Sequence, residues 1–228
     1  MKRLILLRHG QSEWNLENRF TGWTDVELSE KGRREAAEAG HKILKAGLHP
    51  RFFVTSYLKR AIHTLEIAAD VMDLNWVPVI KDWHLNERHY GALQGLNKAD
   101  TAVKYGDEQV KIWRRSFDVR PPELTLDDDR SPAKDARYSM LPSSALPLTE
   151  SLKDTIKRVD ACWEEVIAPK LMVYDTVLVA AHGNSLRALV KNLLNISDED
   201  IVNLEIPTGS PWLFEMDDRL NVVLNRYI

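Results

Sequence analysis

The chain has 228 residues, of which 44% are hydrophobic and 29% charged, and its formal net charge at pH 7 is -3. This length and composition fit one globular domain with a substantial buried core. The single cysteine, Cys162, excludes an intrachain disulfide and a cysteine-based metal cluster, and the slightly negative charge argues against a general binder of nucleic acid or membrane surfaces.

The chain begins with MKRLILLRHG, in which a basic start precedes the short apolar run from Leu4 to Leu7. A signal peptide needs a longer apolar stretch and a small-residue cleavage site. A run of this length is instead typical of a strand that is covered on both faces of a sheet. No apolar run approaches the ~18 residues of a membrane helix. We therefore expect a cytoplasmic protein with no membrane partner and no nucleic-acid partner.

Further strands and helices follow in alternation along the chain. Apolar runs predict strands, and apolar residues at helical spacing predict helices, the first of them between an N-cap at Ser29 and a stop at Gly47. The predicted strands cover residues 52–55, 77–80, 176–181, 212–216 and 222–224, and the predicted helices cover residues 29–46, 57–72, 151–171 and 185–194. This alternation predicts an α/β fold with a mostly parallel sheet, in a single domain over residues 1–228.

Residues 119–149 differ from the rest of the chain. They are rich in Pro, Asp and Ser, show no periodicity, and form a longer connection than compact domains usually contain. Composition alone leaves two interpretations open, an irregular surface insertion without order or a lid that covers a binding site.

Two of the predicted strands end in similar sequences. Leu7 is followed by Arg8-His9-Gly10, and Ala181 is followed by His182-Gly183-Asn184. Ligands of open parallel sheets bind beyond the carboxyl ends of the strands, so the two histidines can meet over one site. Glycine after each histidine permits a tight turn, and a helix beginning near Asn184 would offer free backbone N–H groups to an anion. One histidine at a strand end is more often structural, but the repetition favours a catalytic role.

Several chemistries can be weighed for such a pair. Catalytic zinc usually needs three protein ligands, and the sequence supplies no third one beside these histidines. The G-x-S-x-G motif of many acyl-transfer enzymes and the phosphate-binding loop of nucleotide enzymes are both absent. A neutral imidazole that attacks phosphorus and forms phosphohistidine remains as the candidate. That chemistry needs a cation such as Arg8 to hold the phosphoryl oxygens.

Longer motifs extend from these residues over nearly the whole chain. They include RHGQSEWN at 8–15, FTGWTDVELSEKG at 20–32, SYLKRAIHT at 56–64, LNERHYGALQGLNK at 85–98, RRSFDVRPP at 114–122, ESLKDT at 150–155, AAHGNSLRALVK at 180–191 and ISDEDIVNLEIPTG at 196–209. Together they resemble the histidine phosphatase superfamily and, more narrowly, the cofactor-dependent phosphoglycerate mutases. The segments 85–98 and 114–122 are the most specific, because they distinguish the mutases from general phosphatases.

The resemblance implies a role for each matching residue. His9 is the implied nucleophile, His182 stabilises the transferring phosphoryl group, and Glu87 is the general acid and base. The remaining implied catalytic residues, which clamp the phosphoryl group, are Arg8 and Arg60. The implied substrate-binding residues are Ser12, Asn15, Thr21, Gly22, Tyr90, Lys98, Arg114, Arg115, Gly183 and Asn184. No metal ligand is implied.

The resemblance also implies a fold and a reaction. The fold is a three-layer α/β/α sandwich whose sheet contains one antiparallel strand, among the last strands of the chain. The reaction interconverts 3-phosphoglycerate and 2-phosphoglycerate in glycolysis and gluconeogenesis, through a phosphohistidine enzyme and 2,3-bisphosphoglycerate, which primes the enzyme without any metal. The implied partners are small-molecule phosphoglycerates and further copies of the chain, as a dimer or tetramer. The alternatives are a phosphatase or a bisphosphoglycerate mutase/phosphatase of the same superfamily, and a phospho-ligand-binding protein without catalysis.

Longer members of this family carry a C-terminal tail that closes over the phosphohistidine, whereas this sequence ends at Ile228, close to the last predicted strand. Closure matters because it keeps water away from the phosphohistidine. We therefore expect either that residues 119–149 partly cover the pocket, or that phospho-His9 hydrolyses more readily than in relatives with a tail.

Overall fold

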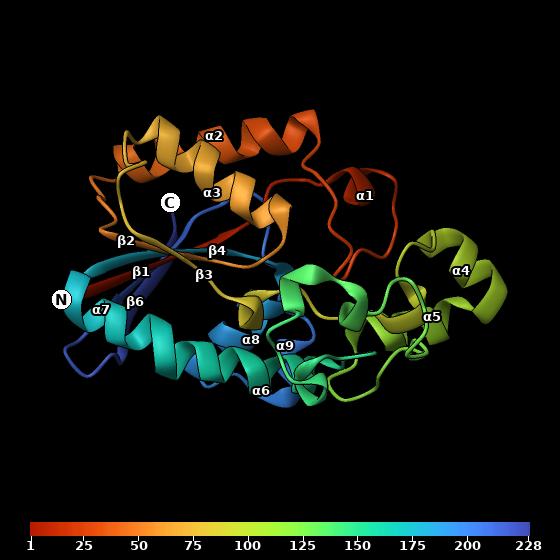
Figure 1. Ribbon diagram of the computed structural model, residues 1–228. Helices are drawn as coiled ribbons and strands as arrows, with labels where there is room; N and C mark the ends of the chain where they lie inside the picture. Colours follow the sequence, from red (N-terminus) through yellow and green to blue (C-terminus); the bar gives the residue numbers. More distant parts are fainter.

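A six-stranded sheet runs through the middle of the computed structural model, which describes residues 1–228 (Figure 1). The strands are β1 (Lys2–Arg8), β2 (Phe52–Thr55), β3 (Val79–Lys81), β4 (Thr176–Ala181), β5 (Trp212–Met216) and β6 (Val222–Tyr227). Their order in the sheet is β3-β2-β4-β1-β5-β6, and β5 alone runs antiparallel to its neighbours. The predicted mostly parallel sheet with one late antiparallel strand is confirmed.

Helices cover both faces of the sheet, which gives the three predicted layers. In Figure 1, α2 (Glu30–Lys45) and α3 (Lys59–Val71) lie above the sheet, and α6 (Leu152–Cys162) and α8 (Gly183–Leu193) lie below it. Because side chains alternate along a strand, Ile5 and Leu7 join the core under α2 and α3, whereas Leu4 and Leu6 join the opposite core. Burial on both faces explains why this strand is continuously apolar.

Two predicted elements differ from the observed ones at a proline. Strand β3 begins at Val79, directly after Pro78, which has no N–H for the sheet ladder. The helix expected over residues 151–171 is divided into α6, a π-helical turn at Trp163–Ile167, and α7 (Ala168–Tyr174). Pro169 explains the interruption, because it cannot donate the backbone hydrogen bond of a regular helix.

Four helices were not predicted, namely α1 (Glu13–Leu16), α4 (Lys98–Tyr105), α5 (Asp107–Arg115) and α9 (Asp198–Ile201). Each is short, and α4 and α5 bury only Thr101 and Val110 respectively, so no apolar stripe marks them in the sequence. Both project from the end of the sheet at the right of Figure 1. No helix of the protein combines the length and the apolar character needed to cross a membrane.

Residues 119–149 form an irregular but packed segment with three short 3₁₀ turns, at Pro132–Lys134, Ala136–Tyr138 and Ser143–Ala145. Tyr138 anchors it, with only 2% of its surface exposed and its ring 4.9 Å from that of Trp23. The Tyr138 hydroxyl accepts a hydrogen bond of 2.8 Å from the side chain of Asn86. The segment is therefore attached to the two loops, around residues 20–25 and 84–94, that lead into the site described next.

Candidate active site

The parallel pairing of β1 and β4 brings the two histidines together. Arg8 lies opposite Ala181 in the ladder, so His9 and His182 leave the sheet side by side. Their ring centroids are 5.0 Å apart, with an angle of 61° between the ring planes. Both side chains are almost fully buried. The juxtaposition expected from the two similar strand ends is thus present.

His9 is held as a neutral imidazole with a defined tautomer. Its Nδ1 lies 2.6 Å from the backbone carbonyl of Gly10, which can only accept, so Nδ1 carries the proton. Its Nε2 lone pair therefore faces the Nε–H of Arg60, at 3.3 Å. Burial, followed by the charges of Arg60 and Arg8, lowers the pKa of His9 well below its ordinary value. A neutral ring with an unprotonated Nε2 is the form that acts as a nucleophile.

Arg60 lies in the first turn of α3 and is fixed by the loop at residues 20–25. Its guanidinium donates to the carbonyls of Gly22, at 2.8 Å, and Thr24, at 3.0 Å. Burial lowers the pKa of Arg60 to about 10, which still leaves it charged at neutral pH. Gly22 has a φ of +56°, and a Cβ there would lie 2.1 Å from the side-chain oxygen of Gln94. Only glycine fits the turn that holds this arginine.

His182 lies beside His9 but does not line the cavity that the other site residues border. Its Nε2 is 2.8 Å from the hydroxyl of Ser56, and its Nδ1 is buried without a hydrogen-bond partner. Burial, and then the charge of Arg60, lower the pKa of His182 well below its ordinary value. The neutral ring of His182 therefore packs against the ring of His9.

Glu87 is fixed at both its carboxylate and its backbone. One carboxylate oxygen, Oε1, accepts hydrogen bonds from the backbone N–H groups of Arg88, at 2.7 Å, and Asn184, at 3.1 Å. Its backbone carbonyl accepts from the indole of Trp23, at 2.6 Å, and from Arg158, at 2.9 Å. Helix α8 begins at Gly183, close to the start predicted near Asn184. The backbone N–H of Asn184, in its first turn, binds the Glu87 carboxylate.

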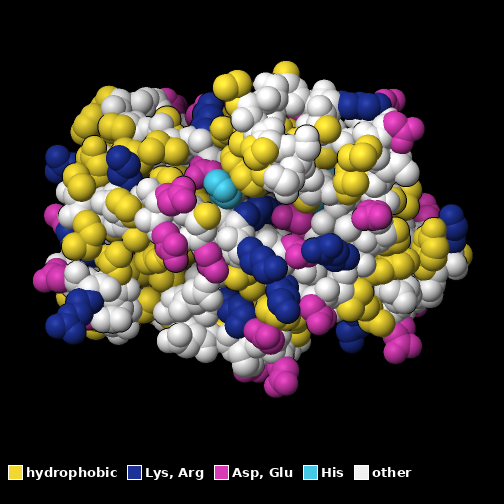
Figure 2. All heavy atoms as spheres, turned by 60° about the horizontal axis from the view of Figure 1, so that its bottom comes forward, with side chains coloured by type: hydrophobic (Ala, Val, Ile, Leu, Met, Phe, Trp, Pro, Cys, Tyr) yellow, Lys and Arg dark blue, Asp and Glu magenta, His cyan; other side chains and the backbone are white.

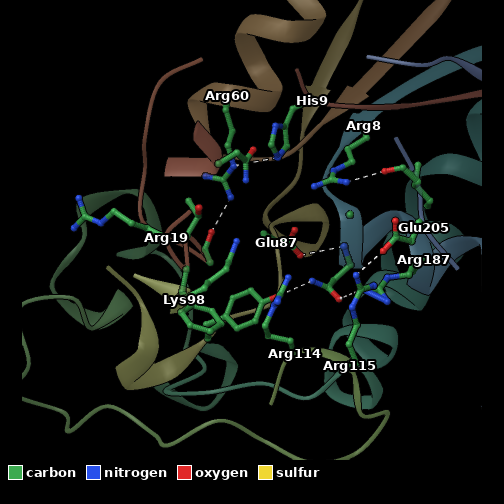
Figure 3. A pocket seen from close by; sticks show the side chains of 18 of the residues that line it. Arg8, His9, Arg19, Arg60, Glu87, Lys98, Arg114, Arg115, Arg187 and Glu205 are labelled. Atoms are coloured by element: carbon green, nitrogen blue, oxygen red, sulfur yellow. Dashed lines mark hydrogen bonds and ion pairs between the residues drawn. The ribbon is translucent and has the colours of Figure 1, made fainter. Parts of the chain in front are cut away.

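These residues border a cavity of about 270 Å³ that is rich in cations. Figure 3 shows His9, Arg8 and Arg60 at one end, Arg114, Arg115 and Arg187 at the other, and Glu87 between them. The lining cations are Arg8, Arg19, Arg60, Lys98, Arg114, Arg115 and Arg187, against the two carboxylates Glu87 and Glu205. The Thr21 hydroxyl and the Arg8 Nε–H are buried without partners. Such a site suits a small ligand with anionic groups at both ends.

All of the predicted site residues line this cavity except His182 and Ser12. Ser12 was expected to line the pocket, but it is fully buried and its hydroxyl accepts from the backbone N–H of Asn15 as the N-cap of α1. It thereby orients Asn15, whose side-chain oxygen accepts from the Ser12 N–H at 3.1 Å. No group of three or more His, Cys, Asp or Glu side chains is placed to hold a metal ion.

Some lining residues were not singled out from the sequence. Arg187 lies one helical turn after Asn184 and donates to its side-chain oxygen at 3.0 Å, so the i, i+3 spacing could have indicated it. No motif in the sequence around Arg19 indicates that it lines the cavity. The segment 204–207 also lines the cavity, and the backbone carbonyl of Ile206 accepts from Arg8 at 2.7 Å.

A family model and individual relatives give the same result when the chain is compared with known proteins. Residues 4–227 match the family model described as histidine phosphatase superfamily (branch 1). The chain is 58% identical, over its whole length and 92% of the relative, to a 2,3-bisphosphoglycerate-dependent phosphoglycerate mutase of Porphyromonas gingivalis. It is 56% identical to a protein of the same name from Dichelobacter nodosus, over its whole length and 93% of that relative.

Solved structures share the fold at lower identity. A mycobacterial glucosyl-3-phosphoglycerate phosphatase superposes with a TM-score of 0.74 at 25% identity, covering all of this chain and 97% of the other. The α-ribazole phosphatase of Shigella flexneri superposes with a TM-score of 0.69 at 19% identity, covering 94% and 91% of the two chains. The second similarity concerns the fold alone.

Proposed function

The chain belongs to the histidine phosphatase superfamily, and we propose that within it the chain is a 2,3-bisphosphoglycerate-dependent phosphoglycerate mutase. The full-length similarity to curated enzymes of that name supports this proposal. So does the distribution of cations in the pocket, because the substrate carries a phosphate and a carboxylate that both need positive partners. The single observation that carries the proposal is the presence of His9, whose ring contacts Arg60, at one end of a pocket and an arginine cluster at the other.

His9 is the proposed nucleophile. Its neutral Nε2 attacks the phosphorus of a bound phosphate ester, a P–N bond forms, and the P–O bond to the substrate oxygen breaks. Arg8, Arg60 and the side-chain amide of Asn15 hold the phosphoryl oxygens. His182, packed beside His9, stabilises the charge that develops during transfer. In the reverse direction the substrate hydroxyl attacks the same phosphorus and the P–N bond breaks.

Glu87 is the proposed proton carrier. As acid it gives a proton to the departing substrate oxygen, and as base it removes the proton from the attacking hydroxyl. Its backbone is fixed by Trp23 and Arg158, which keeps the carboxylate between the two ends of the cavity. The same residue can then serve both transfers, because the ligand reverses its orientation while the carboxylate stays in place.

The second end of the ligand meets a separate group of side chains. We propose that the distal carboxylate or second phosphate is bound by Tyr90, Lys98, Arg114, Arg115 and Asn184, with Thr21, Gly22 and Gly183 shaping the walls. Tyr90 is fixed for this role, since its hydroxyl lies 3.3 Å from the amide of Asn184 and Arg88 stacks 4.5 Å from its ring. Each close pair of opposite charges provides roughly 4 kcal/mol at an effective dielectric constant near 20, before the cost of desolvation.

We also propose a phosphoryl donor, a cellular compartment and an oligomeric state for the enzyme. 2,3-Bisphosphoglycerate supplies the phosphoryl group that primes His9, and the pocket fits it because cations lie at both ends. We propose that no metal takes part, that the enzyme acts in glycolysis and gluconeogenesis in the cytoplasm, and that it forms a dimer or tetramer. The family resemblance supports these points.

A coupled assay tests the function directly. Conversion of 3-phosphoglycerate to 2-phosphoglycerate is followed with and without trace 2,3-bisphosphoglycerate, and again with protein that was treated with EDTA and freed of the chelator before the metal-dependent coupling enzymes were added. We expect turnover that depends on the bisphosphate and does not respond to EDTA. Turnover without the bisphosphate, or its abolition by EDTA, would contradict the proposed mechanism.

A phosphatase is the second candidate, because a mycobacterial phosphatase shares the fold at 25% identity. The same assay separates the two functions when released inorganic phosphate is measured alongside 2-phosphoglycerate. A mutase forms 2-phosphoglycerate much faster than phosphate, whereas a phosphatase releases phosphate from 3-phosphoglycerate and forms no isomer.

A further inference from the structure

Glu205 places a negative charge at the rim of a pocket that otherwise collects anions. It lies between α9 and β5, and its carboxylate contacts Arg115, the last residue of α5, with Oε1 and Nη2 2.5 Å apart. The Glu205 side chain is 75% exposed and that of Arg115 is 35% exposed. Figure 3 shows Glu205 beside Arg187 at one side of the cavity, between Arg8 and Arg115.

The backbone that follows Glu205 is held by hydrogen bonds to Arg8. The carbonyl of Ile206 accepts from the Arg8 guanidinium at 2.7 Å, and the Gly209 N–H donates to the Arg8 carbonyl at 3.0 Å. The contact with Arg115 lowers the pKa of Glu205 below its ordinary value, and the nearby charges of Arg187 and Arg8 act in the same direction. Glu205 is therefore ionised at neutral pH and faces several of the cations that line the pocket.

The two carboxylates that line the pocket, Glu87 and Glu205, have different hydrogen-bond donors. Glu87 accepts hydrogen bonds from two backbone N–H groups, whereas Glu205 is paired with a side chain that we assign to the distal anion of the ligand. An anion that binds Arg115 must displace Glu205 or share the guanidinium with it. Because exposed ion pairs are weak, breaking this one costs little free energy.

We propose that Glu205 is an exchangeable counter-ion of Arg115, and that it limits how tightly the pocket holds ligands with a second anionic group. The inference rests on the proposed function for the identity of the ligand. A bisphosphate that must reverse its orientation has to leave the distal cations during each cycle, and a competing carboxylate gives Arg115 a partner while it does so. Glu205 would thus set specificity through repulsion as well as through pairing.

Substitution Glu205→Gln tests this role, with binding measured by calorimetry on the dephosphorylated enzyme at low ionic strength. The probes are 3-phosphoglycerate and glycerol 3-phosphate, which differ in the carboxylate. We expect the Kd of 3-phosphoglycerate to fall about three- to tenfold, since one repelling charge is removed. The Kd of glycerol 3-phosphate should change less than about twofold. The gain should shrink at high salt because exposed charges are screened.

Glu199→Gln is the matched control, because it removes the same charge from an exposed position in the neighbouring α9. It should leave both affinities unchanged. Weaker binding of 3-phosphoglycerate by Glu205→Gln would mean that Glu205 only positions Arg115, and an equal gain for both probes would mean a general charge effect. Unchanged affinity for 3-phosphoglycerate would equally overturn the inference. Binding needs no turnover, so an inactive wild-type enzyme would contradict only the proposed function.

Discussion

At the scale of single residues, the site depends on histidines that stay neutral. His9 and His182 are buried together with Arg60, and burial and nearby positive charge both oppose protonation. The Nε2 lone pair of His9 therefore remains available at pH values where an exposed histidine is already charged. Neutral histidines among fixed cations allow one pocket to bind anions and to keep its nucleophile reactive.

Glu87→Gln tests the assignment of the proton carrier. The amide keeps an oxygen that can accept from the N–H groups of Arg88 and Asn184 but cannot shuttle a proton. We expect kcat in the coupled assay to fall about 10²- to 10⁴-fold, the usual contribution of general acid–base catalysis. An unchanged unfolding midpoint would show that the fold is intact. Turnover close to that of the wild type would assign proton transfer to another group.

Arg114→Ala and Arg115→Ala test the distal subsite. Each removes a charged donor proposed to hold the second anionic group, so the KM for 3-phosphoglycerate should rise about tenfold or more. Hydrolysis of p-nitrophenyl phosphate, which lacks that group, should change less than about twofold. Equal losses on the two substrates would show that the arginines support the fold rather than bind the ligand.

His89 gives a pH dependence of stability. It is fully buried, its Nδ1 accepts from the Gly91 N–H at 3.0 Å, and burial lowers its pKa to about 3. Between pH 6.5 and 3 the unfolded chain therefore binds a proton that the folded protein does not. The free energy of unfolding should fall as the pH decreases through this range, by up to about 1.4 kcal/mol per pH unit for this residue.

His89→Asn isolates that contribution, because its side-chain oxygen can replace Nδ1 as acceptor without titrating. Urea unfolding followed by tryptophan fluorescence from pH 4.5 to 7.5 should give a shallower loss of stability in the variant than in the wild type. Parallel curves for the two proteins would mean that His89 takes up its proton in the folded state as well.

At the scale of elements, apolar runs made the sheet predictable, because strands buried on both faces must be apolar along their whole length. Apolar residues at helical spacing located α2 and α3, each of which buries a face along its length. The sequences of helices α4 and α5 contain no such apolar pattern, because each helix buries only one residue. Helix α5 nevertheless carries Arg114 and Arg115. The resemblance to known motifs identified these arginines, whereas periodicity could not, since α5 buries only Val110.

Residues 119–149 show another limit of sequence interpretation. Composition left open whether the segment forms a lid, and the structure places none of its residues in the lining of the pocket. It packs instead behind the loops that hold Arg60 and Glu87, through Tyr138 and an ion pair of 2.6 Å between Arg137 and Asp25. The expectation that it partly covers the pocket is therefore not supported.

A buried ion pair between Arg158 of α6 and Glu150, just before that helix, fixes the segment that carries Glu87. The Arg158 guanidinium donates twice to Glu150, at 2.7 and 2.8 Å, and also to the backbone carbonyls of His84, Asn86 and Glu87. All five of its N–H groups are thereby satisfied. Nothing in the sequence distinguishes this arginine from a surface one, because its partners come from separate elements.

Glu150→Gln should therefore be strongly destabilising. It leaves the Arg158 charge buried without its counter-charge, and we expect a loss of about 3–5 kcal/mol in the free energy of unfolding. Asp129→Asn is the matched control, since it breaks the exposed pair with Lys134 and should cost no more than about 1 kcal/mol. Urea denaturation measures both, and similar small effects would show that the buried pair adds little.

At the scale of the whole molecule, charge is distributed unevenly. The chain has a net charge of -3, yet the pocket at His9 is lined by seven cations and two carboxylates. On the face shown in Figure 2, Lys and Arg side chains are interspersed with Asp and Glu. Composition could not predict this concentration, because it arises where strand ends, loops and α5 converge. Anion binding thus depends on local geometry rather than on the total charge.

The most direct test of the account is to identify the residue that becomes phosphorylated. The wild-type protein and His9→Ala are incubated with labelled 2,3-bisphosphoglycerate, and the label is mapped after proteolysis. We expect one acid-labile, alkali-stable phosphohistidine at His9 in the wild type and no label in the variant. Label that persists in His9→Ala at His182, or a wild-type protein that takes up no label, would contradict the assignment of His9 as the nucleophile.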